Sequence, residues 1–193
     1  MTKQKFVLFA LALAGAAALA HPALAQKPAA PAAPAAPAPV SSDPETQTAS
    51  YGDWTLRCQR NPQGAGPKRL CEVAQSVTIK GQQQPIAQIA FGRVTADEPL
   101  RMTVVIPNDV GFPSAVRVDV DEKDSQPAEL AWTRCLPVGC FATAAPVADT
   151  LKRWRAGTGN GRLGVKTAEG KQVFIPFSFR GLAQALDALA AQK

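Results

Sequence analysis

The sequence predicts a mostly β fold: an antiparallel, sandwich-like or barrel-like single domain with two short helices, one of them at the C-terminus. Apolar and polar residues alternate in several short segments, and Gly, Pro and Asp clusters separate those segments. A period of two is the spacing of a strand that buries one face. Short strands divided by turn residues are typical of all-β sandwiches and barrels. Two further stretches have helical spacing instead, which accounts for the two helices.

The predicted strands follow the chain in order, and each is identified by its alternating positions. These positions are Trp54, Leu56 and Cys58; Cys71, Val73, Gln75, Val77 and Ile79; Leu100, Met102, Val104 and Ile106; Val116, Val118 and Val120; Leu130 and Trp132; and Val173, Ile175, Phe177 and Phe179. Gln75 is the one polar member of the second set.

The two predicted helices span residues 146–155 and 181–190. In the first, P-V-A-D-T-L-K-R-W-R, the acidic Asp149 comes early and the basic residues come late, which is the order that the helix dipole favours. In the second, G-L-A-Q-A-L-D-A-L-A, the apolar positions fall on one face and predict a stripe that docks on the sheet. That stripe consists of Leu182, Ala185, Leu186 and Leu189.

Residues 1–25 have the layout of a secretory signal peptide. Lys3 and Lys5 precede an apolar run over residues 6–19, and A-L-A at residues 23–25 offers a cleavage site. The run is shorter than the ~20 residues that a membrane span needs, and no longer apolar run follows. We therefore predict an exported chain, either periplasmic or secreted to the cell surface or beyond, without a transmembrane segment after cleavage.

Residues 26–50 are rich in alanine and proline and show no apolar periodicity. Such a segment buries too little surface to offset the entropy lost on ordering, so we predict a disordered linker. It could be a passive spacer or a tether to the envelope. Residues 51–193 then form one domain of a size that supports its own core.

Composition excludes several function classes. The single histidine, His21, lies in the predicted signal peptide, which leaves none for a catalytic triad, a histidine general base or the usual catalytic zinc site. Cleavage removes Lys3 and Lys5 and lowers the formal net charge from +6 to +4. That mild excess favours an anionic partner only weakly. We expect no enzyme activity, no catalytic residue, no metal or cofactor, and no nucleic-acid partner.

Four cysteines, at positions 58, 71, 135 and 140, indicate a disulfide framework in an exported chain. Of the three possible connectivities, the turn residues between Cys58 and Cys71 and between Cys135 and Cys140 favour the local pairs. A four-cysteine zinc site usually has two C-x2-C pairs, and a thiol catalyst usually has C-x-x-C at a helix start. Neither spacing occurs here.

Other apparent ligand motifs lack their context. G-N-G-R-L-G at residues 159–164 follows a predicted helix and precedes a strand, which is the reverse of the order in a dinucleotide-binding unit, and the same stretch spells only an interrupted P-loop. Acidic residues at 119–124 resemble a calcium loop, but Lys123, Asp124 and Leu130 occupy positions that need other residues, so we interpret the segment as a solvated turn. The candidate partner-binding residues are basic, although a solubilising face is an equally good interpretation: Lys152, Arg153, Arg155, Arg162 and Lys166.

Several segments together resemble the invasion-associated locus B family. They are D-W-T-L-R-C, a second cysteine a dozen residues later, C-L-P-V-G-C-F-A, and I-P-F-S-F-R-G-L-A-Q-A-L-D-A-L. The resemblance covers about residues 51–189, departs from the family pattern at residues 106–115, and implies an exported, all-β bacterial protein with no established enzymatic activity. The expected function is non-catalytic binding of a macromolecular or anionic surface partner; a role in host-cell invasion is implied only by the family name. The alternative is a periplasmic enzyme, either a thiol-disulfide oxidoreductase or a carboxylate-based hydrolase.

Overall fold

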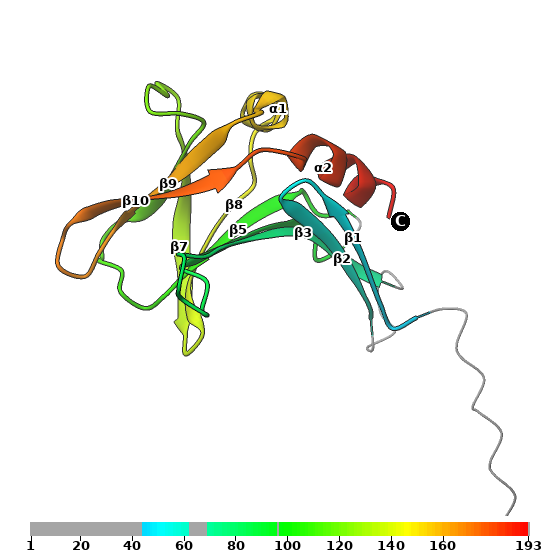
Figure 1. Cartoon of the computed structure of the whole chain (residues 1–193), viewed down its shortest axis with the longest axis horizontal. Helices are drawn as coiled ribbons and strands as arrows, with labels where there is room; N and C mark the ends of the chain where they lie inside the picture. The colour runs from blue at the N-terminus through cyan, green and yellow to red at the C-terminus, as the bar shows by residue number, and fades with distance from the viewer. Residues whose placement is uncertain (1–43, 62–68, 96, 193) are drawn as a thin grey trace, which may run out of the picture. The chain divides into compact units, whose positions relative to one another are not determined.

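The computed structural model describes residues 44–61, 69–95 and 97–192. The predicted signal peptide, the linker up to residue 43 and most of the turn between Cys58 and Cys71 lie outside these ranges. The described part forms one antiparallel sheet and two helices (Figure 1). The mostly β prediction is therefore confirmed, with both helices close to their predicted positions.

Ten strands form the sheet in the spatial order β1-β2-β3-β4-β5-β8-β7-β6-β9-β10. Their bounds are β1 Thr46–Tyr51, β2 Trp54–Arg60, β3 Arg69–Val77, β4 Ala87–Gly92, β5 Arg101–Ile106, β6 Ala115–Asp119, β7 Ala128–Leu136, β8 Gly139–Ala144, β9 Asn160–Lys166 and β10 Gln172–Ser178. Helix α1 spans Ala148–Ala156 and α2 spans Leu182–Ala190. All neighbouring strands are antiparallel, as short connections between strands require.

The first strand corrects one predicted boundary. The linker was expected to extend to residue 50, but β1 begins at Thr46 and pairs with β2 along its whole length. Its residues T-Q-T-A-S-Y are exposed almost throughout, so no alternation of buried and exposed positions marks this strand in the sequence. The strand forms because its backbone N–H and C=O groups pair with those of β2, and this pairing leaves no mark on the side-chain composition.

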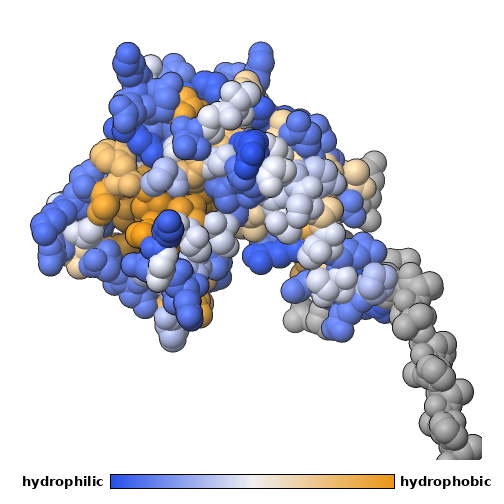
Figure 2. All heavy atoms as spheres, viewed as in Figure 1, coloured by the Kyte–Doolittle hydropathy of each residue, from blue (hydrophilic) through white to orange (hydrophobic). Residues whose placement is uncertain are grey.

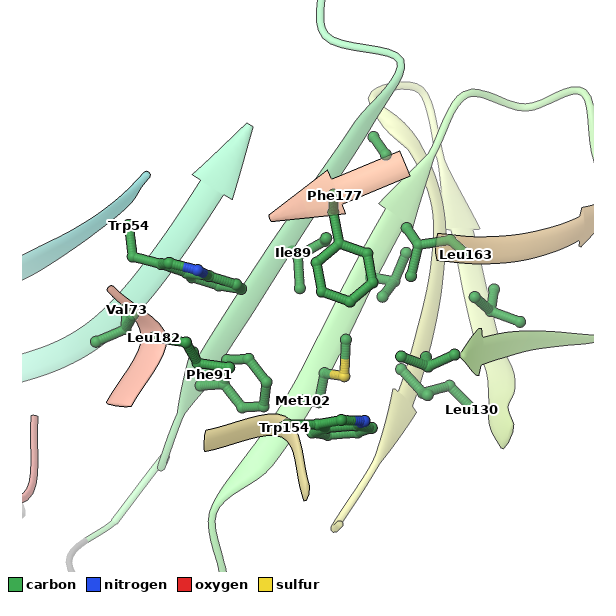
Figure 3. Close-up of a cluster of buried hydrophobic side chains, with 14 of the residues drawn as sticks. Trp54, Val73, Ile89, Phe91, Met102, Leu130, Trp154, Leu163, Phe177 and Leu182 are labelled. Atoms are coloured by element: carbon green, nitrogen blue, oxygen red, sulfur yellow. The ribbon is translucent and has the colours of Figure 1, made fainter. Parts of the chain in front are cut away.

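The core lies on the inner face of the sheet and beneath both helices. Trp54, Phe91 and Trp154 pack ring against ring, with centroids 5.6 Å apart for the first pair and 5.9 Å for the second. They come from β2, β4 and α1, and Figure 3 shows them pointing toward one another around Met102. The predicted stripe of α2 is buried, and α2 packs against β2 and β3. Burying these apolar surfaces supplies most of the driving force for folding.

Gln75 links β3, the third strand from one edge of the sheet, to β10 at the other edge. Its side chain is buried on β3, where its Oε1 accepts a hydrogen bond from Ser178 N of β10 at 2.9 Å. Its Nε2 donates to the carbonyls of Ser178 and Asp53, each at 3.2 Å. Trp54 Nε1 also donates to the Ser178 carbonyl, at 2.9 Å. The polar exception in the predicted β3 pattern therefore closes the sheet into a barrel-like shape.

A second contact holds the β1–β2 turn against the start of α2. Asp53 N donates to the Arg180 carbonyl at 3.1 Å, and the Arg180 guanidinium binds the Asp53 carboxylate at 2.5 Å and 3.0 Å. The hydrogen bond and charge of Arg180, aided by Ser178, lower the pKa of Asp53 to about 2. Because the carboxylate is bound in its charged form, this contact stabilises the fold above the ordinary carboxyl pKa.

We expect the Asp53 contact to make stability depend on acid pH. The ordinary pKa of 3.8 is lowered to about 2 in the fold, so the contribution is complete above the first value and is lost as the pH falls through the second. Asp53→Asn should reduce the pH dependence of the urea midpoint in this window. The matched control is Asp97→Asn, on an exposed residue, which should retain the wild-type dependence. A wild-type profile in Asp53→Asn would contradict this role.

Candidate functional site

The structure forms both local disulfides. Cys58 lies directly opposite Cys71 in the β2–β3 pair, and Cys135 lies opposite Cys140 in the β7–β8 pair. Each disulfide therefore joins two neighbouring strands that are already hydrogen-bonded to each other. This is the connectivity that the intervening turn residues indicate, and it places all four cysteines in structural links.

Three of the five candidate basic residues are held within the protein. Arg153 binds Asp124 at 2.8 Å and the Gln126 carbonyl, and Arg155 binds Asp187 of α2. These contacts attach α1 to the turn after β6 and to α2. Trp154, between them, is buried. The two arginines are therefore structural links rather than an open contact surface.

Arg162 is engaged in the same way on β9. Its guanidinium lies 3.4 Å from the buried carboxylate of Asp119, 3.7 Å from Glu122 and 4.5 Å from the centre of the Phe174 ring. Lys152 and Lys166 are exposed and form no ion pair within the described ranges. They do not meet, because β9 extends away from α1 and Lys166 is at its far end (Figure 1). The predicted five-residue patch is therefore not assembled.

The acidic segment at residues 119–124 is a turn with residues 121–123 exposed, as the sequence predicts, but the side chains at its two ends are buried. Asp119 is fully buried and also binds Arg117 at 2.7 Å. Asp124 accepts hydrogen bonds from the N–H groups of Val120 and Gln126 as well as from Arg153. Burial, the largest single influence, raises the pKa of Asp124, but these three donors together hold it below its ordinary value. Buried carboxylates here bind guanidinium and backbone donors, as buried charges must.

The connection that departs from the family pattern is an ordered loop. It runs from the end of β5 to the start of β6, and Gly111 N donates to the Lys166 carbonyl at 2.8 Å. Trp132 Nε1 donates to Ser114 Oγ at 3.0 Å, and the Phe112 ring meets the Trp132 ring edge-on at 6.0 Å. These contacts fix the loop against β7 and β9.

A groove of about 450 Å³ lies on the outer face of the sheet, across β2, β3, β4, β5 and β8. These strands are curved, and α2 lies on the opposite side of the sheet (Figure 1). Figure 2 shows an indentation along the lower side of the domain. The apolar area in the same view lies in a different place, beside β10. The volume falls within the range of small-ligand sites, roughly 300–1,000 Å³.

Strand register explains why the face is hollow. Outward side chains form three rows across the strands, with Gly92 in the first row and Ala74 and Ala90 in the second. These small residues form the floor, and longer side chains around them form the walls. The rows are Arg57, Glu72, Gly92 and Arg101; Thr55, Ala74, Ala90, Thr103 and Thr143; and Ser76, Gln88, Val105 and Phe141.

The groove carries an excess of positive charge at one end. Its lining contains Arg57, Arg93 and Arg101 but a single carboxylate, Glu72, which Arg57 binds at 2.6 Å. Arg93 and Arg101 are exposed and form no ion pair with any residue that the structure describes. Two guanidinium groups are therefore free to bind an anion from solution.

Sequence reasoning missed this groove because its signal needs register. The alternating apolar residues of β3, beginning at Cys71, point to the core. The groove is instead formed largely by the side chains between those positions, which point outward. Small outward residues on β3 and β4 were the available signal. They become a floor only when the strands are aligned, and the sequence does not show that alignment.

Neither helix among residues 44–61, 69–95 and 97–192 is long and apolar enough to cross a membrane. In the same ranges, no three His, Cys, Asp or Glu side chains are grouped in a way that could hold a metal ion.

The comparisons identify relatives by family and by fold. The family model for the invasion associated locus B (IalB) protein matches residues 54–190. The crystal structure of invasion associated protein b from Bartonella henselae is similar, with a TM-score of 0.63 and 21% identity over 75% of this chain and 95% of that chain. A search of curated proteins finds no match.

Proposed function

The chain belongs to the invasion associated locus B family, and we propose that it is an exported, non-catalytic binding protein whose outer-face groove holds an anionic partner. The observation that carries the proposal is the pair of free arginines, Arg93 and Arg101, beside a floor of small residues. Most other arginines of the sheet and helices bind carboxylates within the protein. Arg93 and Arg101 differ because they line the groove, are exposed, and form no ion pair with any residue in the described ranges.

Export is supported by the layout of residues 1–25 together with the two disulfides. Disulfides persist in oxidising compartments such as the periplasm and the cell surface. Family membership is consistent with the same compartment. The proposed partner is therefore one that the protein meets outside the cytoplasm.

The chemistry of the groove suits binding rather than catalysis. Its one carboxylate, Glu72, is already bound by Arg57 at 2.6 Å, and the lining offers no second carboxylate with which it could share acid–base work. The disulfide nearest the floor, Cys58–Cys71, lies across a strand pair, and Cys58 is buried. A thiol catalyst instead needs an accessible thiolate in a stabilising position.

We expect a photoreactive amino acid at Thr103, inside the groove, to crosslink the partner in living cells. The charge-reversal variant Arg93→Glu/Arg101→Glu should lose this adduct. It should also lose the association with the envelope that wild type shows at low salt, because much of the attraction is between charges that salt screens. Exposed charges change stability by less than about 0.5 kcal/mol, so the variant should remain folded. Adduct mass and fractionation across salt concentrations provide the measurements.

The matched control is Lys152→Glu/Lys166→Glu, which makes the same change of net charge at exposed residues outside the groove. It should retain both the adduct and the association. Loss of the adduct in this control to the same degree as in the groove variant would show that overall charge, not the groove, determines binding.

A further inference from the structure

We propose that the ligand of the groove is an acidic oligosaccharide. Its anionic group lies against Arg93 and Arg101, and its sugar rings extend along the strands toward Phe141. This inference rests on the proposed function, since it names the class of partner for the same groove. Charge, hydrogen-bonding capacity and the position of the groove on the sheet support it.

The arginine end selects for an anion. Arg101 lies in the same row as Gly92, which carries no side chain, and Arg93 follows Gly92 directly in the chain. Glu72 in that row is already bound by Arg57. A carboxylate, sulfate or phosphate placed over Gly92 can therefore be bound by two planar guanidinium groups, which are well suited to bidentate contacts with such anions.

The middle and far rows select for hydroxyl groups. Thr103 lines the groove beside the alanine floor, and Ser76 and Gln88 line it in the next row. Hydroxyl and amide groups both donate and accept hydrogen bonds. Sugar hydroxyl groups can displace the water bound to these side chains, because they also donate and accept hydrogen bonds. An acyl chain would displace the same water without replacing its hydrogen bonds and would therefore lose affinity.

Phe141 provides an aromatic surface at the opposite end. It lines the groove, and the Arg134 guanidinium lies 5.0 Å from the centre of its ring, which holds the ring in place. The Phe141 row is four strand residues from the Arg101 row, or about 13 Å at the usual rise of a strand. This length accommodates a short oligosaccharide in contact with both ends, more than a single sugar ring spans.

An acidic peptide fits less well, because the groove lies on the face of the sheet. Extended peptides usually bind a sheet by pairing their backbone with an exposed edge strand. Here β3, β4 and β5 have neighbours on both sides, so their backbone groups are already used in the ladder. A peptide in this groove would gain no such pairing.

The test is binding of the full mature chain to a panel of carboxylated, sulfated and phosphorylated oligosaccharides, with matched neutral oligosaccharides, tetraglutamate and myristate as comparison ligands. We expect at least one acidic oligosaccharide to saturate binding and to shift the backbone amide signals of β4 and β5. The neutral oligosaccharides should bind at least about tenfold more weakly, because they lack the charged contact. Tetraglutamate and myristate carry a charge but no sugar hydroxyl groups, and they should bind more weakly by a similar factor.

Two groove variants separate charge from shape. Arg93→Glu/Arg101→Glu should weaken binding of the acidic oligosaccharide by at least about tenfold. Ala90→Leu should weaken it to a similar degree by filling the floor, with no change of charge. Lys152→Glu/Lys166→Glu should bind like wild type.

The inference is wrong if no acidic oligosaccharide binds, if tetraglutamate or myristate binds as tightly, or if the amide shifts lie outside the groove. If Thr103 still crosslinks a partner and the groove variant abolishes that adduct, the proposed function stands while the sugar ligand is excluded. If the adduct is also absent, both fail.

Discussion

Gly181→Ala is expected to lower the free energy of unfolding by about 2–5 kcal/mol. Gly181 precedes α2 with a φ of +89°, a conformation that side-chain-bearing residues rarely adopt. A Cβ added there would lie 2.0 Å from the Tyr51 carbonyl oxygen and 2.5 Å from its carbon. Both atoms are backbone, so no rotamer change relieves the clash.

The clash would break the contact between the β1–β2 turn and the start of α2. Gly52, which follows Tyr51 in the chain, also has little room, because a Cβ on it would lie 2.5 Å from the Arg180 carbonyl oxygen. Separating the two segments would also disturb the hydrogen bond from Asp53 N to that oxygen and the Asp53–Arg180 ion pair. Left-handed strain costs about 1–2 kcal/mol, and forced overpacking adds about 1–3 kcal/mol.

Gly81→Ala is the matched control because it separates these two contributions. Gly81 has a φ of +88°, but nothing lies within 4 Å of a Cβ built on it. Its substitution should therefore cost only the backbone strain, about 1–2 kcal/mol. Both variants can be compared by urea unfolding with the disulfides intact. Equal losses in the two variants would show that the close approach to Tyr51 contributes nothing.

The sequence predicts strands of this fold where alternation is strong. Trp54 to Cys58 and Met102 to Ile106 alternate because one face of each strand meets the core, and burial at those positions follows the pattern. β9 was missed because Gly161 and Gly164 interrupt its pattern where only a small residue fits: a Cβ on Gly161 would lie 2.6 Å from the Phe179 ring. That constraint comes from a partner distant in the sequence.

The site is harder to predict than the fold, because the sequence shows the basic residues but not the carboxylates that bind them in the folded chain. Arg153, Arg155 and Arg162 were grouped by proximity in the chain, but their carboxylates belong to other elements: Asp124, Asp187 and Asp119. Conversely, Arg93 and Arg101 belong to no basic cluster in the sequence, and only the folded arrangement shows that they have no carboxylate partner within the described ranges. Long-range pairing decides which charges stay available to a partner.

Gln75→Leu is expected to lower the free energy of unfolding by about 2–4 kcal/mol. Leucine is close to glutamine in size, so the loss comes from hydrogen bonds rather than from a cavity. Ser178 N would lose its acceptor, and the Asp53 carbonyl would lose its side-chain donor. A buried group left without a partner costs about 1–3 kcal/mol, and the carbonyl of the exposed Asp53 can regain part of its loss from water, so the total stays near 2–4 kcal/mol. The Ser178 carbonyl is affected less, because Trp54 Nε1 still donates to it.

This substitution also tests whether Gln75 closes the sheet. If its side chain holds β3 to β10, the Ser178 amide should exchange with solvent faster in Gln75→Leu by a larger factor than amides in the β4–β5 pair, because the seam opens locally before the whole domain unfolds. Gln88→Leu is the control: it removes an exposed amide from the neighbouring strand and should change stability by less than about 0.5 kcal/mol. A uniform change in exchange across the sheet would instead mean that Gln75 contributes to overall stability without closing the sheet locally. In that case β10 would be held in place by the packing of Phe177 and Phe179 against the core.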